Sequence, residues 1–202
     1  MDKEVKVFSL SADKVNIDTS LAMRYLRVRR EPDENTKEML KDCFKEFLDC
    51  VSYKASYRYF DIKIDGKKIY FDDEMVLESE HLARNLDGCK GAFVFVATTS
   101  SAVDRLLIKH SNLRVSRAVI VDAIGSAQIE AFCDILCDKL EREYSVTLKP
   151  RFSPGYGDLS ILTQKQVLKA CDSSRKIGVT LTDSHLMIPK KSVSAIVGVS
   201  EK

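Results

Sequence analysis

Alternating apolar and polar residues predict most of the strands in this chain. Six segments show either this alternation or a short apolar run typical of a buried strand: residues 5–10, 57–64, 68–71, 91–98, 177–181 and 193–199. Asp65-Gly66 separates the second segment from the third and is a turn pair that favours a hairpin. Residues 91–98 are the most continuously apolar, so we expect them to form a central strand covered on both faces.

Apolar residues that repeat at a period near 3.6 predict helices between these strands. The predicted helices are residues 20–30, a helix entered at 32–35 and continuing to 51, and residues 78–86, 101–110, 115–144 and 163–171. Strands and helices are interspersed, with no repeat, low-complexity segment or linker between them. We therefore expect residues 1–202 to form one compact α+β domain, with a mixed or antiparallel sheet flanked by helices.

The longest predicted helix carries two acids near its apolar face. Asp122 lies three residues after Val119, on the same side as Val115, and Glu130 lies about 80° further around the axis at 100° per residue. Acids on a partly buried face need partners. Gly125 interrupts the same helix at a cost of about 1 kcal/mol relative to alanine, which indicates close packing or the close approach of a ligand.

The charge balance argues against a nucleic-acid or membrane partner. Thirty-two basic and 30 acidic side chains leave a net charge of +2, and both signs are mixed along the chain. Arg27, Arg29 and Arg30 form a basic cluster, for which a solvated face is a commoner explanation than a binding patch. No apolar run approaches the roughly 18 residues of a spanning helix, and the N-terminus is polar, so we expect a cytoplasmic protein.

The cysteines and histidines lack the spacing of a metal site. Six cysteines include no C-x-x-C pair, and three histidines include no H-E-x-x-H pattern. Cys133 and Cys137 lie four residues apart among apolar residues, where a small apolar side chain is wanted. We expect buried thiols and no metal centre.

Residues 151–158, with the sequence RFSPGYGD, hold the strongest candidates for ligand binding. Arg151 can bind a carboxylate through two parallel N–H···O bonds. Pro154-Gly155 is a turn pair, and glycine lets a ligand approach the main chain closely. The rings of Phe152 and Tyr156 could stack on a flat base or face a cation. On composition alone, the alternative is a solvated loop whose arginine pairs with a nearby acid.

Four linked motifs in the C-terminal third resemble one family. They are R-x-x-P-G-Y at 151–156, T-Q-K at 163–165, G-V-x-L-T-D-S-x-x-M-x-P at 178–189 and S-V-S at 192–194. In this order and spacing they closely resemble the activation domain of vitamin B12-dependent methionine synthase. Upstream, residues 122–126 and 130–132 look like the long helix of that family. The resemblance covers most of the chain from about Gly91 onward.

The resemblance implies a fold, a ligand and partners. The family's domain is an α+β fold with a twisted sheet that binds S-adenosylmethionine and presents its methyl group to cobalamin. It thereby restores oxidised, inactive cob(II)alamin with one electron from a flavodoxin-like donor. No general acid or base is needed, because the cofactor supplies the chemistry and the protein positions the ligand.

Site residues also follow from the resemblance. Arg151 would bind the ligand's carboxylate, and Glu130 would accept hydrogen bonds from ribose hydroxyls or the ammonium group. The backbone of Ser153, Pro154, Gly155 and Tyr156 would face the adenosine.

The chain departs from the family at several of these positions. Gln164 and Asp183 replace glutamates, Ala195 replaces a glycine, and residues 159–161 read L-S-I where the family often has P-D/E-H. The chain stops at Lys202, before a tyrosine-bearing segment that completes the ligand site in longer versions. For a further N-terminal aspartate of the family, Asp18 is the candidate.

Three functions remain in competition on this sequence. The chain has no room for homocysteine, folate or cobalamin modules, so it is not a methionine synthase by itself. We expect a free-standing S-adenosylmethionine-binding activation subunit that acts on a separate cobalamin-dependent methionine synthase or other corrinoid protein. The alternative is a non-catalytic interaction or scaffold protein that kept the fold and lost the ligand. A conventional methyltransferase is disfavoured because no G-x-G turn between a strand and a helix is present.

Overall fold

Strand β5 (Gly91–Thr98) is the centre of the fold. In the computed structural model, which describes residues 1–15, 19–26 and 33–200, all eight of its residues are buried. It pairs antiparallel with β2 (Tyr53–Asp65) on one side and with β9 (Ser192–Ser200) on the other. The predicted central strand is therefore confirmed.

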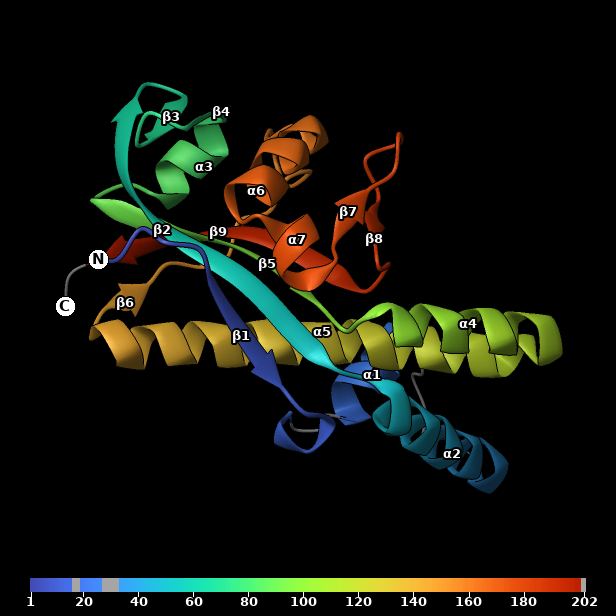
Figure 1. The fold of residues 1–202 in the computed structure, drawn as a ribbon. Coiled ribbons are helices and arrows are strands. Elements are labelled where there is room, and N and C mark those ends of the chain that lie inside the picture. Colours follow the sequence, from blue (N-terminus) through green and yellow to red (C-terminus); the bar gives the residue numbers. More distant parts are fainter. Residues whose placement is uncertain (16–18, 27–32, 201–202) are drawn as a thin grey trace.

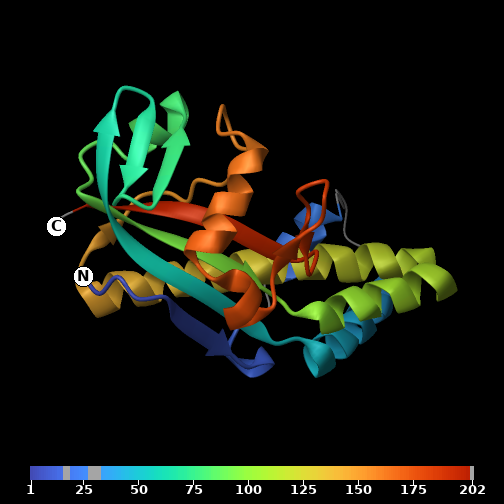
Figure 2. The same ribbon diagram turned by 45° about the horizontal axis from the view of Figure 1, so that its top comes forward.

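The main sheet extends outward from this centre in the order β4-β3-β2-β5-β9-β6, with β1 also pairing to β2. The remaining strands are β1 (Lys6–Leu10), β3 (Lys68–Phe71), β4 (Met75–Glu78) and β6 (Thr147–Leu148), and a separate two-stranded sheet consists of β7 (Thr180–Leu181) and β8 (Met187–Ile188). Every pairing between these strands is antiparallel, which decides between the mixed and antiparallel alternatives. Figure 2 shows β2 bending between the part that pairs with β5 and the part that pairs with β3.

Helices cover both faces of the sheet (Figure 1). The long helix α5 crosses one face, with α2 and α4 beside it, and the short helices α3, α6 and α7 lie over the other. The helices are α1 (Thr19–Tyr25), α2 (Glu34–Cys50), α3 (Glu80–Asn85), α4 (Ser101–Leu113), α5 (Val115–Tyr144), α6 (Gln164–Ala170) and α7 (Ser173–Ile177), with 3-10 turns η1 (Ala12–Lys14) and η2 (Ile161–Thr163). The chain is thus a single α+β domain with an antiparallel sheet flanked by helices, as expected.

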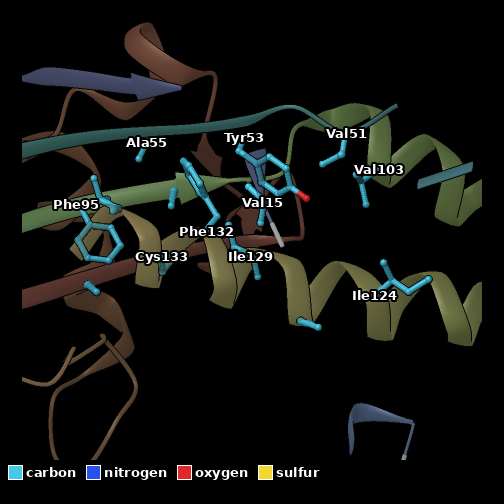
Figure 3. Close-up of a cluster of buried hydrophobic side chains, with 14 of the residues drawn as sticks. Val15, Val51, Tyr53, Ala55, Phe95, Val103, Ile124, Ile129, Phe132 and Cys133 are labelled. Carbon is cyan, nitrogen blue, oxygen red and sulfur yellow. The ribbon is translucent and has the colours of Figure 1, made fainter. Parts of the chain in front are cut away.

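Two hydrophobic cores result, one on each face of the sheet. Alternate residues of β5 point into each, so that Phe93 and Phe95 contribute to the core under α5 while Val94 and Val96 contribute to the core under α6. Figure 3 shows the first core, where Phe132 of α5 lies near Tyr53 of β2. The centroids of these two rings are 5.3 Å apart. These packed cores fix α5 relative to the sheet edge at β9 and β6.

Several predicted element boundaries were wrong. Helix α1 ends at Tyr25, and the predicted continuation with the basic cluster lies outside the described residues. Strand β4 was missed because it is only four residues long, and its last residue, Glu78, was predicted as the start of the following helix. Ile177 ends a helix rather than starting a strand, because Gly178 takes a left-handed φ of +72°.

The predicted apolar face of α5 was also wrong at its first turns. Val115 and Val119 are 69% and 55% exposed. Asp122 is exposed as well, and its Oδ1 lies 2.8 Å from Lys191 Nζ. The physical reason is that this end of α5 extends past the sheet and packs against α1, α2 and α4 (Figure 1). Its buried residues, Ile120, Val121 and Ile124 among them, lie on other sides of the helix than Val115 and Val119. The stem of Lys191 explains Gly125, since a Cβ there would lie 3.0 Å from Lys191 Cγ.

The thiols follow the expectation in part. Three of the six cysteines are buried and three, Cys50, Cys89 and Cys137, are half-buried.

Among the described residues no group of three or more potential ligands could hold a metal ion. Within that same part of the chain, no helix has both the length and the apolar character needed to cross a bilayer.

Candidate functional site

A cavity of about 760 Å³ lies between α5 and the segment that follows β6. Its volume is in the range of roughly 300–1,000 Å³ that is usual for small-molecule sites. The lining residues come from α5, from β6 with the segment and turn that follow it, and from β9: Glu130, Asp134, Cys137, Asp138, Glu141, Leu148, Lys149, Pro150, Arg151, Ser153, Tyr156 and Val193. The cavity therefore contains four of the six predicted site residues.

Arg151 faces α5 because its neighbour is anchored to the sheet. Phe152 forms an isolated bridge with Ile196 of β9, in which each amide donates to the other's carbonyl at 2.9 and 2.8 Å. Phe152 is consequently buried, with 5% exposure. Adjacent residues of an extended chain point to opposite sides, so the side chain of Arg151 is directed away from that core.

Two carboxylates on α5 hold the Arg151 guanidinium. Its Nη2 donates to Glu130 Oε2 at 2.6 Å, and its Nη1 donates to Asp134 Oδ1. Burial of the guanidinium lowers its pKa, but Cys133 and the two neighbouring acids raise it, and the pKa of Arg151 is raised overall. The sequence identified Arg151 and Glu130, which the structure brings together. It missed Asp134, although a position four residues after Glu130 lies on the same helical face.

The lining of the cavity is predominantly acidic. Asp138 and Glu141 continue the row begun by Glu130 and Asp134 along α5. The Oε1 atom of Glu141 accepts a hydrogen bond from the Leu148 amide at 2.7 Å. Four carboxylates against two cations, Lys149 and Arg151, leave a formal charge of −2 in the lining. A ligand that carries a surplus positive charge suits this cavity better than an anion.

The turn after Phe152 is closed by its own backbone. The Tyr156 amide donates to the Ser153 carbonyl at 3.0 Å, and the Gly155 amide donates to the Leu159 carbonyl at 2.8 Å. Gly155 has a φ of +87°, a conformation that L side chains rarely adopt. Ser153 and Tyr156 line the cavity, whereas Pro154 and Gly155 shape the turn without lining it.

Only one of the two predicted aromatic rings is free for a ligand. The Tyr156 side chain is 68% exposed. Its ring meets the buried Phe152 edge-on, with centroids 5.3 Å apart and an interplanar angle of 79°. The prediction that Phe152 offers its ring to a ligand was wrong, because the bridge to β9 turns that ring into the core.

Asp158 fixes the far end of the turn to α3. Its carboxylate accepts hydrogen bonds from the Ser79 hydroxyl, from the Glu80 amide at 2.7 Å and from the His81 amide at 3.2 Å. The Ser79 hydroxyl and the two backbone amides lower the pKa of Asp158 to about 2. Sequence reasoning missed this contact, since nothing in the chain signals a pairing between residues 79 positions apart.

A comparison of the whole chain with solved structures shows which known fold it has. The crystal structure of the MetH reactivation domain bound to AdoHcy matches with a TM-score of 0.75, covering 97% of this chain and 78% of that chain at 15% sequence identity. This chain has the MetH reactivation-domain fold. The expected likeness to a methionine synthase activation domain is therefore confirmed for the fold. Neither a scan of protein-family models nor a sequence search of curated proteins finds a match.

The other motif residues support the reactivation-domain fold from outside the cavity. The Ser192 hydroxyl donates to the Pro189 carbonyl at 2.7 Å and to Thr98 Oγ1 at 2.8 Å, which ties β9 to the end of β5. Gln164 is buried at the start of α6. Asp18, the candidate for a further ligand-binding acid of the fold family, lies outside the described residues.

Proposed function

We propose that this protein is a cytoplasmic activation subunit that binds S-adenosylmethionine beside Arg151. It would supply the methyl group for reductive methylation of cob(II)alamin on a separate cobalamin-dependent methionine synthase or related corrinoid methyltransferase. One observation carries the proposal: Arg151 and Glu130 meet in the wall of a ligand-sized cavity, in a fold shared with the MetH reactivation domain that was solved bound to AdoHcy.

The ligand's charged groups match the cavity. S-adenosylmethionine carries a carboxylate, an ammonium group and a sulfonium, so its net charge is positive. The Arg151 guanidinium has five N–H donors, and two of them serve Glu130 and Asp134. Asp134 is the more exposed of the two acids, at 68% against 36% for Glu130. A ligand carboxylate would displace Asp134, because an exposed ion pair is weak. Glu130 would then accept from the ribose or the ammonium group.

The turn would hold the adenosine. The exposed ring of Tyr156 offers a face for stacking on adenine, a contact worth about 0.5–1.5 kcal/mol beyond the area it buries. Ser153 lines the cavity wall, and its backbone would face the adenosine. Pro154 and Gly155 would contribute by setting the shape of the turn.

The partner would dock at the rim formed by this turn. Exposed apolar side chains gather there, with Tyr156, Ile161 and Leu162 at 68%, 44% and 59% exposure. A methyl group can be passed to another protein only where the ligand reaches the surface. We therefore place the corrinoid protein against this rim. The electron would come from a flavodoxin-like reductant that acts on the partner, and cobalamin would supply the chemistry there.

Calorimetric titration with S-adenosylmethionine tests the ligand half of the proposal. The wild-type protein should bind saturably. Arg151→Ala should lose roughly 10- to 150-fold in affinity, since hydrogen bonds between charged groups contribute about 1.5–3 kcal/mol. The matched control is Arg105→Ala on α4, an exposed arginine outside the cavity lining. Absence of wild-type binding at millimolar ligand would contradict the proposal.

A scaffold protein without ligand is the second candidate function. Arg151 is already neutralised by two acids, which is the arrangement expected of a structural ion pair. This reading expects Arg151→Ala to lower stability and leave all partner binding unchanged. Saturable S-adenosylmethionine binding that requires Arg151 would contradict it.

A further inference from the structure

A second cavity, of about 400 Å³, lies between α4 and α5. It shares no lining residue with the cavity beside Arg151. The two helices lie side by side and extend past the sheet (Figure 1). Most of the lining is apolar or small. We define the α4–α5 groove by Tyr25, Leu107, Val115, Ala118, Val119 and Ala123.

Large apolar side chains stand exposed beside small ones in this groove. Val115, Val119 and Tyr25 are 69%, 55% and 47% exposed, whereas Ala118 next to them is buried. Such a hollow accepts side chains that protrude from another helix. Along α5 the lining extends from Val115 to Ser126, about 16 Å at 1.5 Å per residue, which equals three turns of a helix. A contiguous exposed apolar patch of this kind indicates an interaction surface.

The opposite side of the same helix pair already holds a helix, α2. Phe47 of α2 is buried in the core that α4 and α5 share. Glu46 of α2 contacts both helices, because Arg117 Nη2 on α5 donates to its Oε1 at 2.6 Å and His110 Nε2 on α4 lies 3.0 Å from its Oε2. Val119 lies about 160° from Arg117 around the axis of α5, so the α4–α5 groove faces away from α2. The helix pair is therefore held rigidly, and α2 shows what it binds: a helix with an apolar face and an acid.

The charges beside the α4–α5 groove favour a second helix of the same kind. Residues 105–121 contain four lysines and arginines and no aspartate or glutamate. Arg114 lies at the tip of the hairpin and Lys190 lines the cavity, and both are exposed. Among the residues that the structure describes, their side chains have no hydrogen-bond or ion-pair partner. The acid in the lining, Asp122, is already paired with Lys191 at 2.8 Å. The unpaired charges at the groove are thus positive at both of its ends.

We propose that the α4–α5 groove binds an amphipathic helix of a partner protein, with apolar side chains in the hollow and acidic side chains facing Arg114 and Lys190. In this mode of recognition the partner helix buries side chains at i, i+3 or i+4, and i+7. A flat membrane surface would leave the hollow unfilled. A symmetric pair of this chain would bring the same unpaired cations face to face. The surface is separate from the ligand cavity, so the proposal does not depend on the proposed function.

Selection from a displayed library of helices, with the full-length chain as bait, tests the proposal. The library keeps leucine at i, i+4, i+7 and i+11 and randomises the flanking positions. Enriched clones should carry glutamate or aspartate at the flanks. Measured by fluorescence anisotropy, their peptides should bind the wild type saturably. Val119→Asp should weaken binding by roughly tenfold or more, the loss expected when a buried valine side chain is replaced by a charge.

Two further sets of variants act as controls. Ile108→Asp changes an apolar side chain on α4 that is 59% exposed and lies outside the cavity lining, and it should bind the peptides as the wild type does. Arg114→Glu combined with Lys190→Glu should weaken acidic peptides and favour versions with lysine flanks. Val115→Asp repeats the test at a second exposed position. Thermal unfolding shows whether each variant is folded, and S-adenosylmethionine titration of Val119→Asp should match the wild type.

Several outcomes would overturn the proposal. They are absence of enrichment, enrichment of basic flanks, and peptides that bind Val119→Asp as tightly as the wild type. A wild-type dimer in sedimentation equilibrium that Val119→Asp dissociates would place a second copy of this chain in the groove instead. Binding to vesicles of phosphatidylglycerol and phosphatidylcholine that Val119→Asp abolishes would assign the surface to a membrane. Failure of S-adenosylmethionine to bind would contradict the proposed function and leave this surface standing.

Discussion

Gly157→Ala tests whether the turn beside the cavity is held tightly against α3. Gly157 has a φ of +58°. A Cβ at this position would lie 2.5 Å from His81 Nδ1 and 3.3 Å from His81 Cβ. The backbone of His81 cannot move away freely, because its amide is bonded to Asp158. The ring of His81, which is 53% exposed, must rotate instead.

Replacing Gly157 by alanine has two costs in folding free energy, backbone strain and displacement of the His81 ring. Gly66 is a control at which only the backbone strain applies. The left-handed conformation costs a residue with a Cβ about 1–2 kcal/mol. Forcing the His81 ring off its rotamer costs about 0.5–1.5 kcal/mol more. Gly66, in the β2–β3 hairpin, has the same φ of +58° and nothing within 4 Å of its ideal Cβ. We expect Gly157→Ala to lose about 1 kcal/mol more than Gly66→Ala, or about 2–4 °C in Tm.

The assay is urea unfolding of both variants, each with and without His81→Ala. Removing the ring should rescue the excess loss in Gly157→Ala and change nothing in Gly66→Ala. Gly157→Ala should also weaken S-adenosylmethionine binding, because the turn shifts. Equal losses of stability in the two glycine variants, or no rescue by His81→Ala, would refute the close packing of the turn on α3.

Three further predictions concern other positions. Because the pKa of Asp158 is lowered from 3.8 to about 2, its carboxylate stabilises the fold at pH values above 3.8, and this contribution is lost as pH falls from 3.8 toward 2. Over this pH range the free energy of unfolding of the wild type should therefore fall more steeply than that of Asp158→Asn. Burial raises the pKa of the Cys137 thiol, so its alkylation should be slow at pH 7 and accelerate as pH rises. Because Cys137 lines the cavity, S-adenosylmethionine should slow its alkylation and leave the alkylation of Cys89 unchanged. Ser100 has a φ of +75° and a buried, unpartnered hydroxyl, so Ser100→Gly should raise the free energy of unfolding by about 1 kcal/mol while Ser100→Ala keeps the backbone strain.

The sequence correctly predicted those elements that depend only on neighbouring residues, such as an apolar run or a turn pair. The apolar run at β5 and the turn pair at Gly66 needed no knowledge of distant residues. The face of α5 was wrong at Val119 because periodicity does not reveal where a helix runs past the sheet.

The site shows the same division. Arg151 and Glu130 were predicted from residue type and linked motifs, and the structure brings them together, whereas the buried position of Phe152 depends on a bridge to Ile196. The contact of Asp158 with Ser79 is likewise set by tertiary packing, which sequence spacing does not contain.

The bridge between Phe152 and Ile196 also sets an order of events during synthesis. Leu148 pairs with Val199, the Lys149 amide donates to the Gly198 carbonyl, and Phe152 bonds to Ile196, so three successive points of this cavity wall are hydrogen-bonded to β9. Before residues 192–200 have been synthesised, the chain already contains the acids of α5, but Phe152 lacks the β9 partner that directs Arg151 toward them. Ligand can therefore meet a formed pocket only after the last strand has emerged and paired. A chain released early would carry the binding residues without the site.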